Sequence, residues 1–262
     1  MRDIEITSIE HLVKSLNELP NNYIYRGHSD ISWKLQSTLE RILENNYETE
    51  GKKFEDYAID NFKSRFHLYE KSNIQPCTKL EWLSIMQHYG VPTRMLDFTQ
   101  SPYVAIYFAF ENITKTNKGS FVIYAIDYRS IMKKSLKHLQ EQDKTIQLTY
   151  DEMLYYERNE LFNKIDEKAY EILWIVEPRV SNLRIEKQSG CFLISGNVKK
   201  TIEQILKSEI YRDVDNYRFI VPNSFWDNIY TLLRRMNIDS KTIYGDLEGL
   251  SKSIKLFMRA YS

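Results

Sequence analysis

The stretch QHYGVPTRMLDFTQSPYVAIYFAF, residues 87–110, places the polar chemistry of this chain directly before an apolar segment. Gly90 is a natural left-handed stop for the helix that precedes it. A new helix is predicted from Pro102, because Ser101 is a favoured N-cap and proline suits the first helical position. Residues 103–110 are apolar on every side, so this helix is expected to be buried.

The composition is that of an ordinary globular protein. Of 262 residues, 42% are hydrophobic and 27% are charged, with 36 acidic and 36 basic side chains. The zero net charge removes the simplest argument for a nucleic acid or membrane partner, although a local basic groove stays open. Cys77 and Cys191 have no metal-ligand spacing, so neither a metal nor a disulfide framework is expected. No apolar signal or membrane-spanning stretch is present, which predicts a cytoplasmic protein with no membrane association.

Hydrophobic periodicity predicts strands and helices in mixed order along the chain. The predicted strands cover residues 22–27, 119–128, 171–178, 184–195 and 217–222. The predicted helices lie within residues 8–19, 32–43, 49–75, 78–90, 133–170, 224–238 and 247–261. The mixture predicts one α+β domain over residues 1–262, with a central, mostly antiparallel sheet flanked by helices and a helical insertion at about 130–170.

Polar groups at the start of the apolar helix are candidates for an anion site. Thr99 and Ser101 lie where unpaired backbone N–H groups and the helix dipole attract negative charge. Arg94 precedes them by a few residues. One hypothesis is therefore a pocket for a phosphate or carboxylate, gripped by Arg94 together with Arg26. The alternative is that Ser101 only caps the helix and Arg94 pairs with Asp97.

A second candidate stretch is YRGH, residues 25–28, at the end of the first long predicted strand. The planar fork of Arg26 can reach a diphosphate, and Gly27 suits a close backbone approach. The guanidinium can equally anchor a buried carboxylate. His28 and His88 are candidate acid–base groups, or hydrogen-bonded structural histidines.

The third stretch is RIEKQSGCF, residues 184–192, which is expected to be a strand. Glu186 and Gln188 are two residues apart, so a strand would turn both to the same side. Together they could orient a ribose or stabilise a cationic intermediate. The alternative is that both are surface residues of a hairpin.

These stretches together resemble the FRG domain family, named for an aromatic-Arg-Gly motif that is Tyr25-Arg26-Gly27 here. Residues 87–99 are similar to the family's Gln-His-Tyr-Gly-x-Pro-Thr-Arg-x-Leu-Asp-aromatic-Thr block. Residues 184–192 resemble its Arg-x-x-x-Gln-x-Gly-x-Phe element, and Asp246 to Leu250 resemble the end of its C-terminal part. The resemblance extends over about residues 20–257, in a family found in bacteria, phages and mobile elements.

A more distant similarity, to the Arg–Ser–Glu arrangement of ADP-ribosyltransferases, implies a related fold and roles for these residues. Arg26, beside Gly27, would contact the phosphates or the ribose of NAD, which would be the substrate. Thr99 and Ser101 would shape the nicotinamide pocket. Gln188 would take the place of the catalytic glutamate, with Glu186 as the nearby carboxylate that could substitute for it.

The resemblance implies an NAD-dependent mono-ADP-ribosyltransferase or NAD glycohydrolase, acting as a toxin of a toxin–antitoxin pair or in phage defence. The acceptor would be protein, nucleic acid or water. The alternative is a non-catalytic nucleotide- or anion-binding FRG module, because the amide of Gln188 carries no charge. A third hypothesis is a nucleic-acid-processing factor of a mobile element, which the neutral net charge disfavours.

Overall fold

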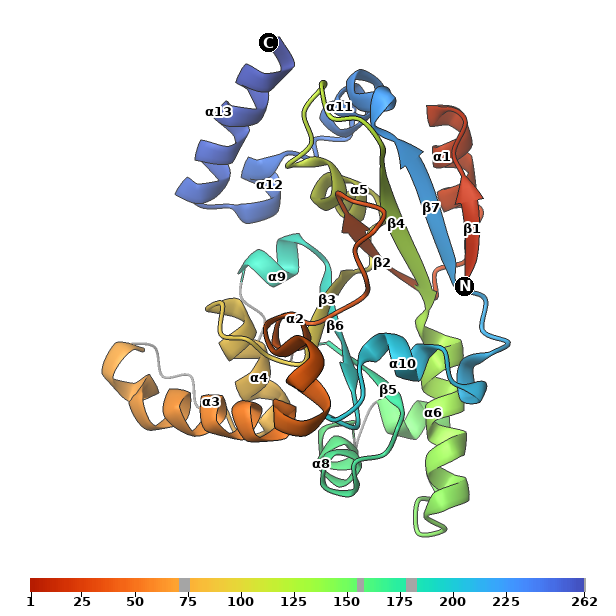
Figure 1. Cartoon of the computed structure of the whole chain (residues 1–262), viewed down its shortest axis with the longest axis vertical. Helices are drawn as coiled ribbons and strands as arrows, with labels where there is room; N and C mark the ends of the chain where they lie inside the picture. The colour runs from red at the N-terminus through yellow and green to blue at the C-terminus, as the bar shows by residue number, and fades with distance from the viewer. Residues whose placement is uncertain (71–75, 155–157, 178–182, 262) are drawn as a thin grey trace.

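A single sheet of seven strands, in the order β1-β7-β4-β2-β3-β6-β5, forms the centre of the computed structural model, which describes residues 1–70, 76–154, 158–177 and 183–261 (Figure 1). The strands are β1 (Arg2–Glu5), β2 (Tyr23–His28), β3 (Met95–Thr99), β4 (Ser120–Asp127), β5 (Leu173–Val176), β6 (Gly190–Ser195) and β7 (Tyr217–Pro222). Every neighbouring pair is antiparallel except β1 and β7, which are parallel. The predicted α+β class and mostly antiparallel sheet are thus confirmed.

Helices cover the two faces of this sheet, and β4 shows how the faces alternate. Phe121, Ile123 and Ala125 pack into one hydrophobic core, and Val122, Tyr124 and Ile126 into another. The first core contains side chains from α1 (Ile9–Asn17), α5 (Pro102–Phe110), α11 (Trp226–Arg235), α12 (Ser240–Tyr244) and α13 (Leu247–Tyr261). The second contains side chains from α3 (Tyr47–Tyr69), α4 (Lys79–His88), α6 (Tyr128–Gln142), α8 (Arg158–Lys168) and α10 (Ile202–Leu206). The remaining α-helices of the described residues are α2 (Thr38–Leu43), α7 (Tyr150–Glu152) and α9 (Leu183–Lys187).

Local capping chemistry fixes the helices that surround the signature stretch. Thr78 and Glu81 form a reciprocal capping box at the start of α4. Gly90 has a φ of 79°, the left-handed conformation expected after that helix. Ser101 caps α5 through a hydrogen bond from the N–H of Val104. These features place the chain of residues 89–101 between two fixed helix ends.

The stretch RIEKQSGCF differs from its prediction. Residues 183–187 form helix α9, and the strand β6 begins only at Gly190. Ser189, with a φ of 46°, makes the turn between them, and its N–H donates to the carbonyl of Glu186. The half-buried Ile185 packs against the hydrophobic core from this helical turn. The expectation that Glu186 and Gln188 share one side of a strand is therefore wrong.

Within the described residues, no helix combines the length and the apolar character that crossing a membrane would require.

Candidate functional site

The sheet forks between β2 and β3. These two strands pair at one position, Tyr25 with Thr99, whereas β2 and β4 pair over six positions and β3 and β6 over five. Beyond Tyr25 and Thr99 the two halves of the sheet separate, while β2 stays paired with β4 and β3 stays paired with β6. The fork opens on the side of residues 26–28 and 95–98, where two recognisable motifs of the sequence meet.

Arg26 spans this fork. Its Nη1 donates a 2.6 Å hydrogen bond to the backbone carbonyl of Asp97, and its Nε donates at 2.8 Å to Nε2 of His28. Because β2 does not pair with β3 here, that carbonyl would otherwise lack a strand partner. Burial and the neighbouring guanidinium lower the pKa of His28 to about 3, so His28 is a neutral acceptor. No hydrogen bond within the described part of the chain uses the remaining nitrogen of Arg26, Nη2.

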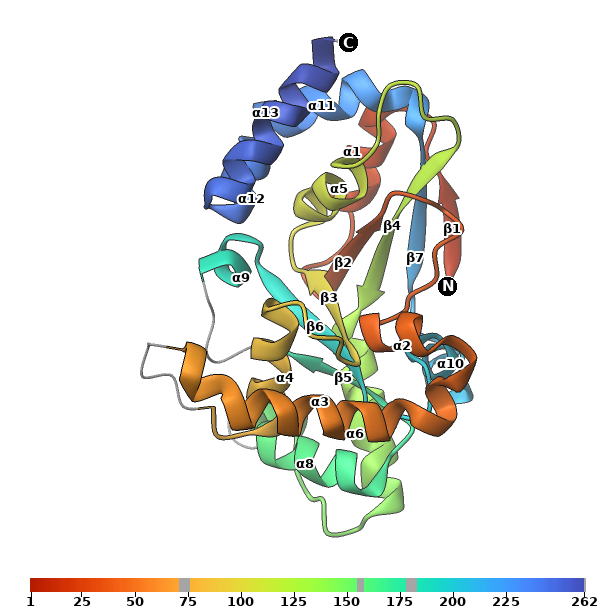
Figure 2. The same cartoon turned by 60° about the vertical axis from the view of Figure 1, so that its left-hand side comes forward.

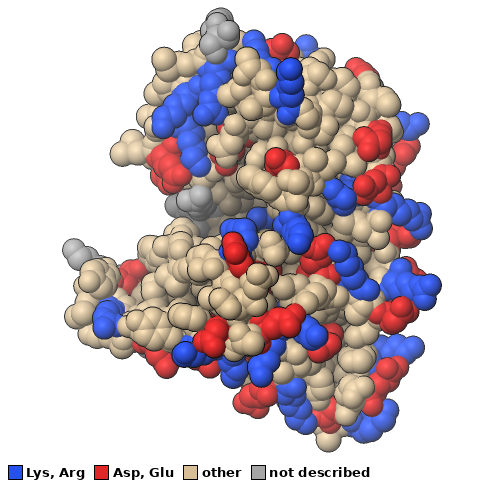
Figure 3. All heavy atoms as spheres, in the orientation of Figure 1, with Lys and Arg blue, Asp and Glu red and all other residues tan. Residues whose placement is uncertain are grey.

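A cavity of about 440 Å³ lies at the fork. It is lined by Tyr25, Arg26, Gly27, Gln87, His88, Gly90, Asp97, Phe98, Thr99, Phe108, Ile185, Gln188 and Phe192. Figure 2 shows the three strands that contribute to it, β2, β3 and β6, side by side below α5 and next to α9. The surface in Figure 3 is hollowed between the end of the molecule that carries α12 and α13 and the end that carries α3 and α4. Acidic and basic side chains are interspersed on that face.

Five of the residues expected to bind or act on a ligand meet in this cavity: Arg26, Gly27, His88, Thr99 and Gln188. Thr99 is buried and joins two of the motifs. Its hydroxyl donates to the carbonyl of Gln188 at 2.6 Å and accepts from the N–H of Ser101 at 3.0 Å. The side-chain amide of Gln188 reaches the carbonyl of Ile243 in α12 at 3.4 Å. The cavity therefore joins three chain segments that lie far apart in the sequence.

Gly27 has a packing role that explains why glycine follows the arginine. A Cβ placed there would lie 2.0 Å from the carbonyl oxygen of Ala105 and 2.6 Å from the nitrogen of Ala109. Helix α5 thus packs directly on the backbone of β2. Only glycine allows this approach, so the aromatic-Arg-Gly motif sets the distance between the fork and the helix above it.

Two further residues expected at the site, Ser101 before α5 and Glu186 on α9, do not line the cavity. Ser101 is partly buried and acts as the N-cap of α5. Glu186 is exposed on α9. Neither side chain therefore lines the cavity with Arg26, although the N–H of Ser101 donates to the hydroxyl of Thr99.

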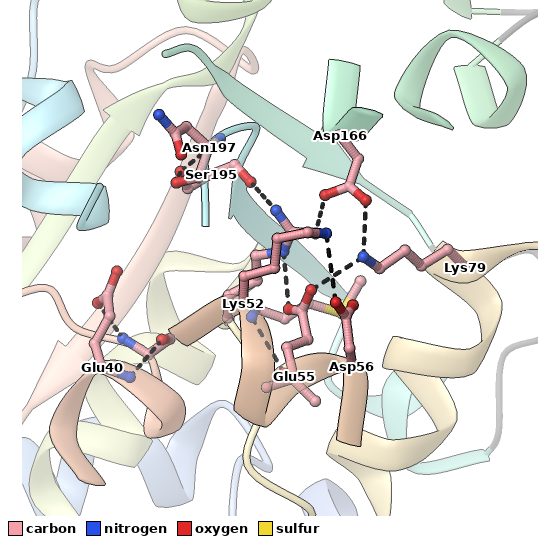
Figure 4. A network of polar contacts seen from close by, with 12 residues as sticks. Glu40, Lys52, Glu55, Asp56, Lys79, Asp166, Ser195 and Asn197 are labelled. Carbon is pink, nitrogen blue, oxygen red and sulfur yellow. Dashed lines mark hydrogen bonds and ion pairs between the residues drawn. The ribbon is translucent and has the colours of Figure 1, made fainter. Parts of the chain in front are cut away.

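Arg94 does not lie at the cavity, in contrast to the expectation from the sequence. Its side chain is 0% exposed, and it forms ion pairs with Glu55, at 2.9 Å, and with Asp166. Lys79 completes the group, at 3.1 Å from Glu55 and 2.7 Å from Asp166. Figure 4 shows Glu55, Lys79 and Asp166 pointing toward one another between α3, α4 and α8. The expectation that Arg94 and Arg26 converge over the start of α5 is wrong, and so is the pairing of Arg94 with Asp97.

The buried group of Arg94, Glu55, Lys79 and Asp166 is electrically balanced, with two cations and two anions. Although burial alone would raise the pKa of Asp166, the charges of Arg94 and Lys79 hold that pKa below its usual value. The two carboxylates likewise raise the pKa of Arg94 against the opposing effect of burial. This balanced group ties α3, α4 and α8 to the residue that precedes β3, and none of its four side chains lines the cavity.

Two cavity residues, Gln87 and Asp97, were not singled out as functional from the sequence. The amide of Gln87 donates to the Asp97 carboxylate at 2.9 Å and accepts from the hydroxyl of Thr93 at 2.7 Å. Both belong to the same signature stretch as His88 and Thr99. The two residues are ten positions apart, and only the turn between α4 and β3 brings them together, so no local sequence pattern indicates their contact.

Across the described residues, no three His, Cys, Asp or Glu side chains gather so that they could hold a metal ion.

The fold and cavity define an α+β protein whose forked sheet presents an arginine, a threonine and an amide to one hollow. Residues 21–118 match the family model of the FRG domain, so the chain carries an FRG domain. The matched range includes Arg26, Gly27 and the whole of residues 87–99, whereas Gln188 and the C-terminal helices lie beyond it. No curated protein and no solved structure matches the chain.

Proposed function

We propose that the cavity at the fork binds NAD, and that the protein is an ADP-ribosyltransferase-like enzyme, a mono-ADP-ribosyltransferase or an NAD glycohydrolase. The observation that carries the proposal is the meeting of Arg26, Thr99 and Gln188 in one cavity. The three strands associated with them, β2, β3 and β6, are neighbours in the sheet. Because these strands are adjacent, Arg26 on β2, Thr99 on β3 and Gln188 just before β6 can contact one dinucleotide.

The chemistry of the cavity suits a nucleotide. Arg26 is held rigidly by His28 and Asp97, and its Nη2 is left for an anionic oxygen. The rings of Phe98, Phe108 and Phe192 give apolar walls for a flat heterocycle. The cavity volume lies within the range of small-molecule sites, about 300–1,000 Å³.

The alternative is a non-catalytic module that binds a nucleotide or another small anion in the same cavity. It is favoured by one observation, that a neutral amide, Gln188, lines the cavity while Glu186 is exposed outside it. Under the enzyme proposal the acceptor is protein, nucleic acid or water, and the resemblance to the FRG family extends the proposal to a toxin or phage-defence role.

The test is NAD binding by titration calorimetry together with nicotinamide release by chromatography. The variants are Arg26→Gln, in the cavity, and Arg212→Gln, whose side chain is 78% exposed and forms an ion pair with Glu209 three residues away. Arg26→Gln loses a charge-assisted contact worth about 1.5–3 kcal/mol, so it should bind NAD roughly 10- to 100-fold more weakly than the wild type. Nicotinamide release should fall in parallel. Arg212→Gln should match the wild type.

Thermal unfolding of each variant separates lost binding from lost folding. Thr99→Val gives a second cavity variant with no change of charge, and it should also weaken binding. A wild type that does not bind NAD would rule out both the cofactor and the enzyme. Binding without nicotinamide release would instead support the non-catalytic module.

A further inference from the structure

The carboxylate that the structure places at the cavity is that of Asp97. Among the described acidic residues, Asp97 alone lines the cavity, and its side chain is 59% exposed. Its Oδ2 lies 4.0 Å from Nη1 of Arg26. Thr99 follows two residues later on β3, so the two side chains lie on the same side of that strand.

A chain of hydrogen bonds fixes the position of this carboxylate. The N–H of Met95 donates to the hydroxyl oxygen of Thr93 at 3.1 Å, and that hydroxyl donates to Oε1 of Gln87 at 2.7 Å. The amide orientation that results turns Nε2 of Gln87 toward Oδ2 of Asp97, at 2.9 Å. Each hydrogen bond fixes the orientation of the next group. The N–H of Met95 therefore acts through Thr93 and Gln87 to orient the carboxylate of Asp97 at the cavity.

The backbone of Asp97 is fixed as well, because its carbonyl accepts from Arg26 and it pairs with Phe192 of β6. No hydrogen bond within the described ranges uses the second carboxylate oxygen, Oδ1. One oxygen is thus held by the amide, and the other keeps its lone pairs. A carboxylate positioned in this way at the cavity can stabilise a positive charge that develops beside it.

We propose that Asp97 supplies the negative charge that stabilises the ribose cation when nicotinamide leaves, with Gln87 as its positioning residue. This inference rests on the proposed function. In the step, the bond between ribose C1′ and the nicotinamide nitrogen breaks, and both electrons leave with nicotinamide, which becomes neutral. The positive charge passes to C1′ and the ring oxygen, close to Asp97. Water or the acceptor then gives an electron pair to C1′ and loses its proton to solvent.

The assignment also accounts for the amide at Gln188. A transferase that carries its carboxylate on β3, beside Thr99, needs no glutamate before β6. Gln188 is then left to contact α12 and to line the cavity, as the structure shows. Glu186 has no part in the reaction.

The experiment compares Asp97→Asn with Glu186→Gln, each an isosteric loss of one negative charge. NAD binding is measured by calorimetry, nicotinamide release under saturating NAD by chromatography, and folding by thermal unfolding. Asp97→Asn should bind NAD within about 3-fold of the wild type and release nicotinamide about 10²–10³-fold more slowly, the loss typical of one preorganised electrostatic group. Glu186→Gln should equal the wild type in both.

Gln87→Met serves as a second variant, which keeps the proposal testable if Asp97→Asn does not fold. It should lower kcat with KM unchanged, because a loosened carboxylate affects the cation more than the bound substrate. Equal release by Asp97→Asn and the wild type, or a loss confined to Glu186→Gln, overturns the role of Asp97 alone. A wild type that binds NAD but releases no nicotinamide overturns the proposed reaction and the role of Asp97 together.

Discussion

Replacing Glu55 by glutamine tests the buried charge group that holds Arg94 away from the cavity. Glu55 is 1% exposed, and its oxygens lie 2.9 Å from Arg94 Nε and 3.1 Å from Lys79 Nζ. At an effective dielectric constant of about 20, each contact is worth about 5–6 kcal/mol of attraction. Glutamine also avoids burying a charge, which offsets several kcal/mol of that loss. We expect Glu55→Gln to lower the free energy of unfolding by about 3–5 kcal/mol, the usual result of breaking a buried pair.

Asp56, the next residue of α3, is the matched control. Its side chain is 48% exposed, and it lies 3.5 Å from Lys52 in a surface pair. Asp56→Asn should change stability by no more than about 0.5 kcal/mol, because solvent screens such pairs. Urea denaturation followed by circular dichroism gives both values. If the two variants agree within about 1 kcal/mol, the charge group is not the tie described above.

Two further changes test the packing and charge of the fold. Gly27→Ala would place a methyl group 2.0 Å from the Ala105 carbonyl, and we expect a loss of about 1–3 kcal/mol or more in urea denaturation; an unchanged midpoint would contradict the direct packing of α5 on β2. The pKa of Asp166 is lower in the folded protein than its value of about 3.9 in the unfolded chain, so ionised Asp166 stabilises the fold above that pH. This stability is lost as the pH falls through the pKa of the folded state. Unfolding free energy should therefore drop below about pH 4, and Asp166→Asn should lack that component; identical pH profiles would count against the assignment.

Local signals in the sequence predict much of the fold because they act over a few residues. The capping box of Thr78 and Glu81, the left-handed Gly90 and the Ser101-Pro102 pair each fix a helix end without help from distant residues. The alternating strand of residues 119–128 is confirmed as β4, since its two sides face two cores.

The missed strands have weak patterns of their own. β1 is four residues long, largely polar, and is held by its parallel pairing with β7 at the other end of the chain. β3 is five residues long and lies between two helix ends, so its pattern is too short to stand out. Residues 183–187, predicted to be part of a strand, form a helical turn from which the half-buried Ile185 packs against the core.

The candidate site, like the fold, could be predicted only in part from the sequence. The resemblance to FRG domains selects Arg26, Thr99 and Gln188, and the fork brings them to one cavity. The position of Arg94 could not be predicted, because its partners Glu55 and Asp166 come from helices that only the tertiary fold brings to it. The same holds for Asp97, whose role follows from a contact with Gln87 across the turn before β3.

The most direct test of the central claim is a crystal structure of the wild-type protein with NAD. The account predicts the dinucleotide in the fork between β2 and β3, with a phosphate oxygen within about 3 Å of Arg26 Nη2 and the nicotinamide ribose beside Thr99 and Asp97. NAD bound elsewhere on the protein, or a fork closed to the ligand at saturating NAD, would contradict it.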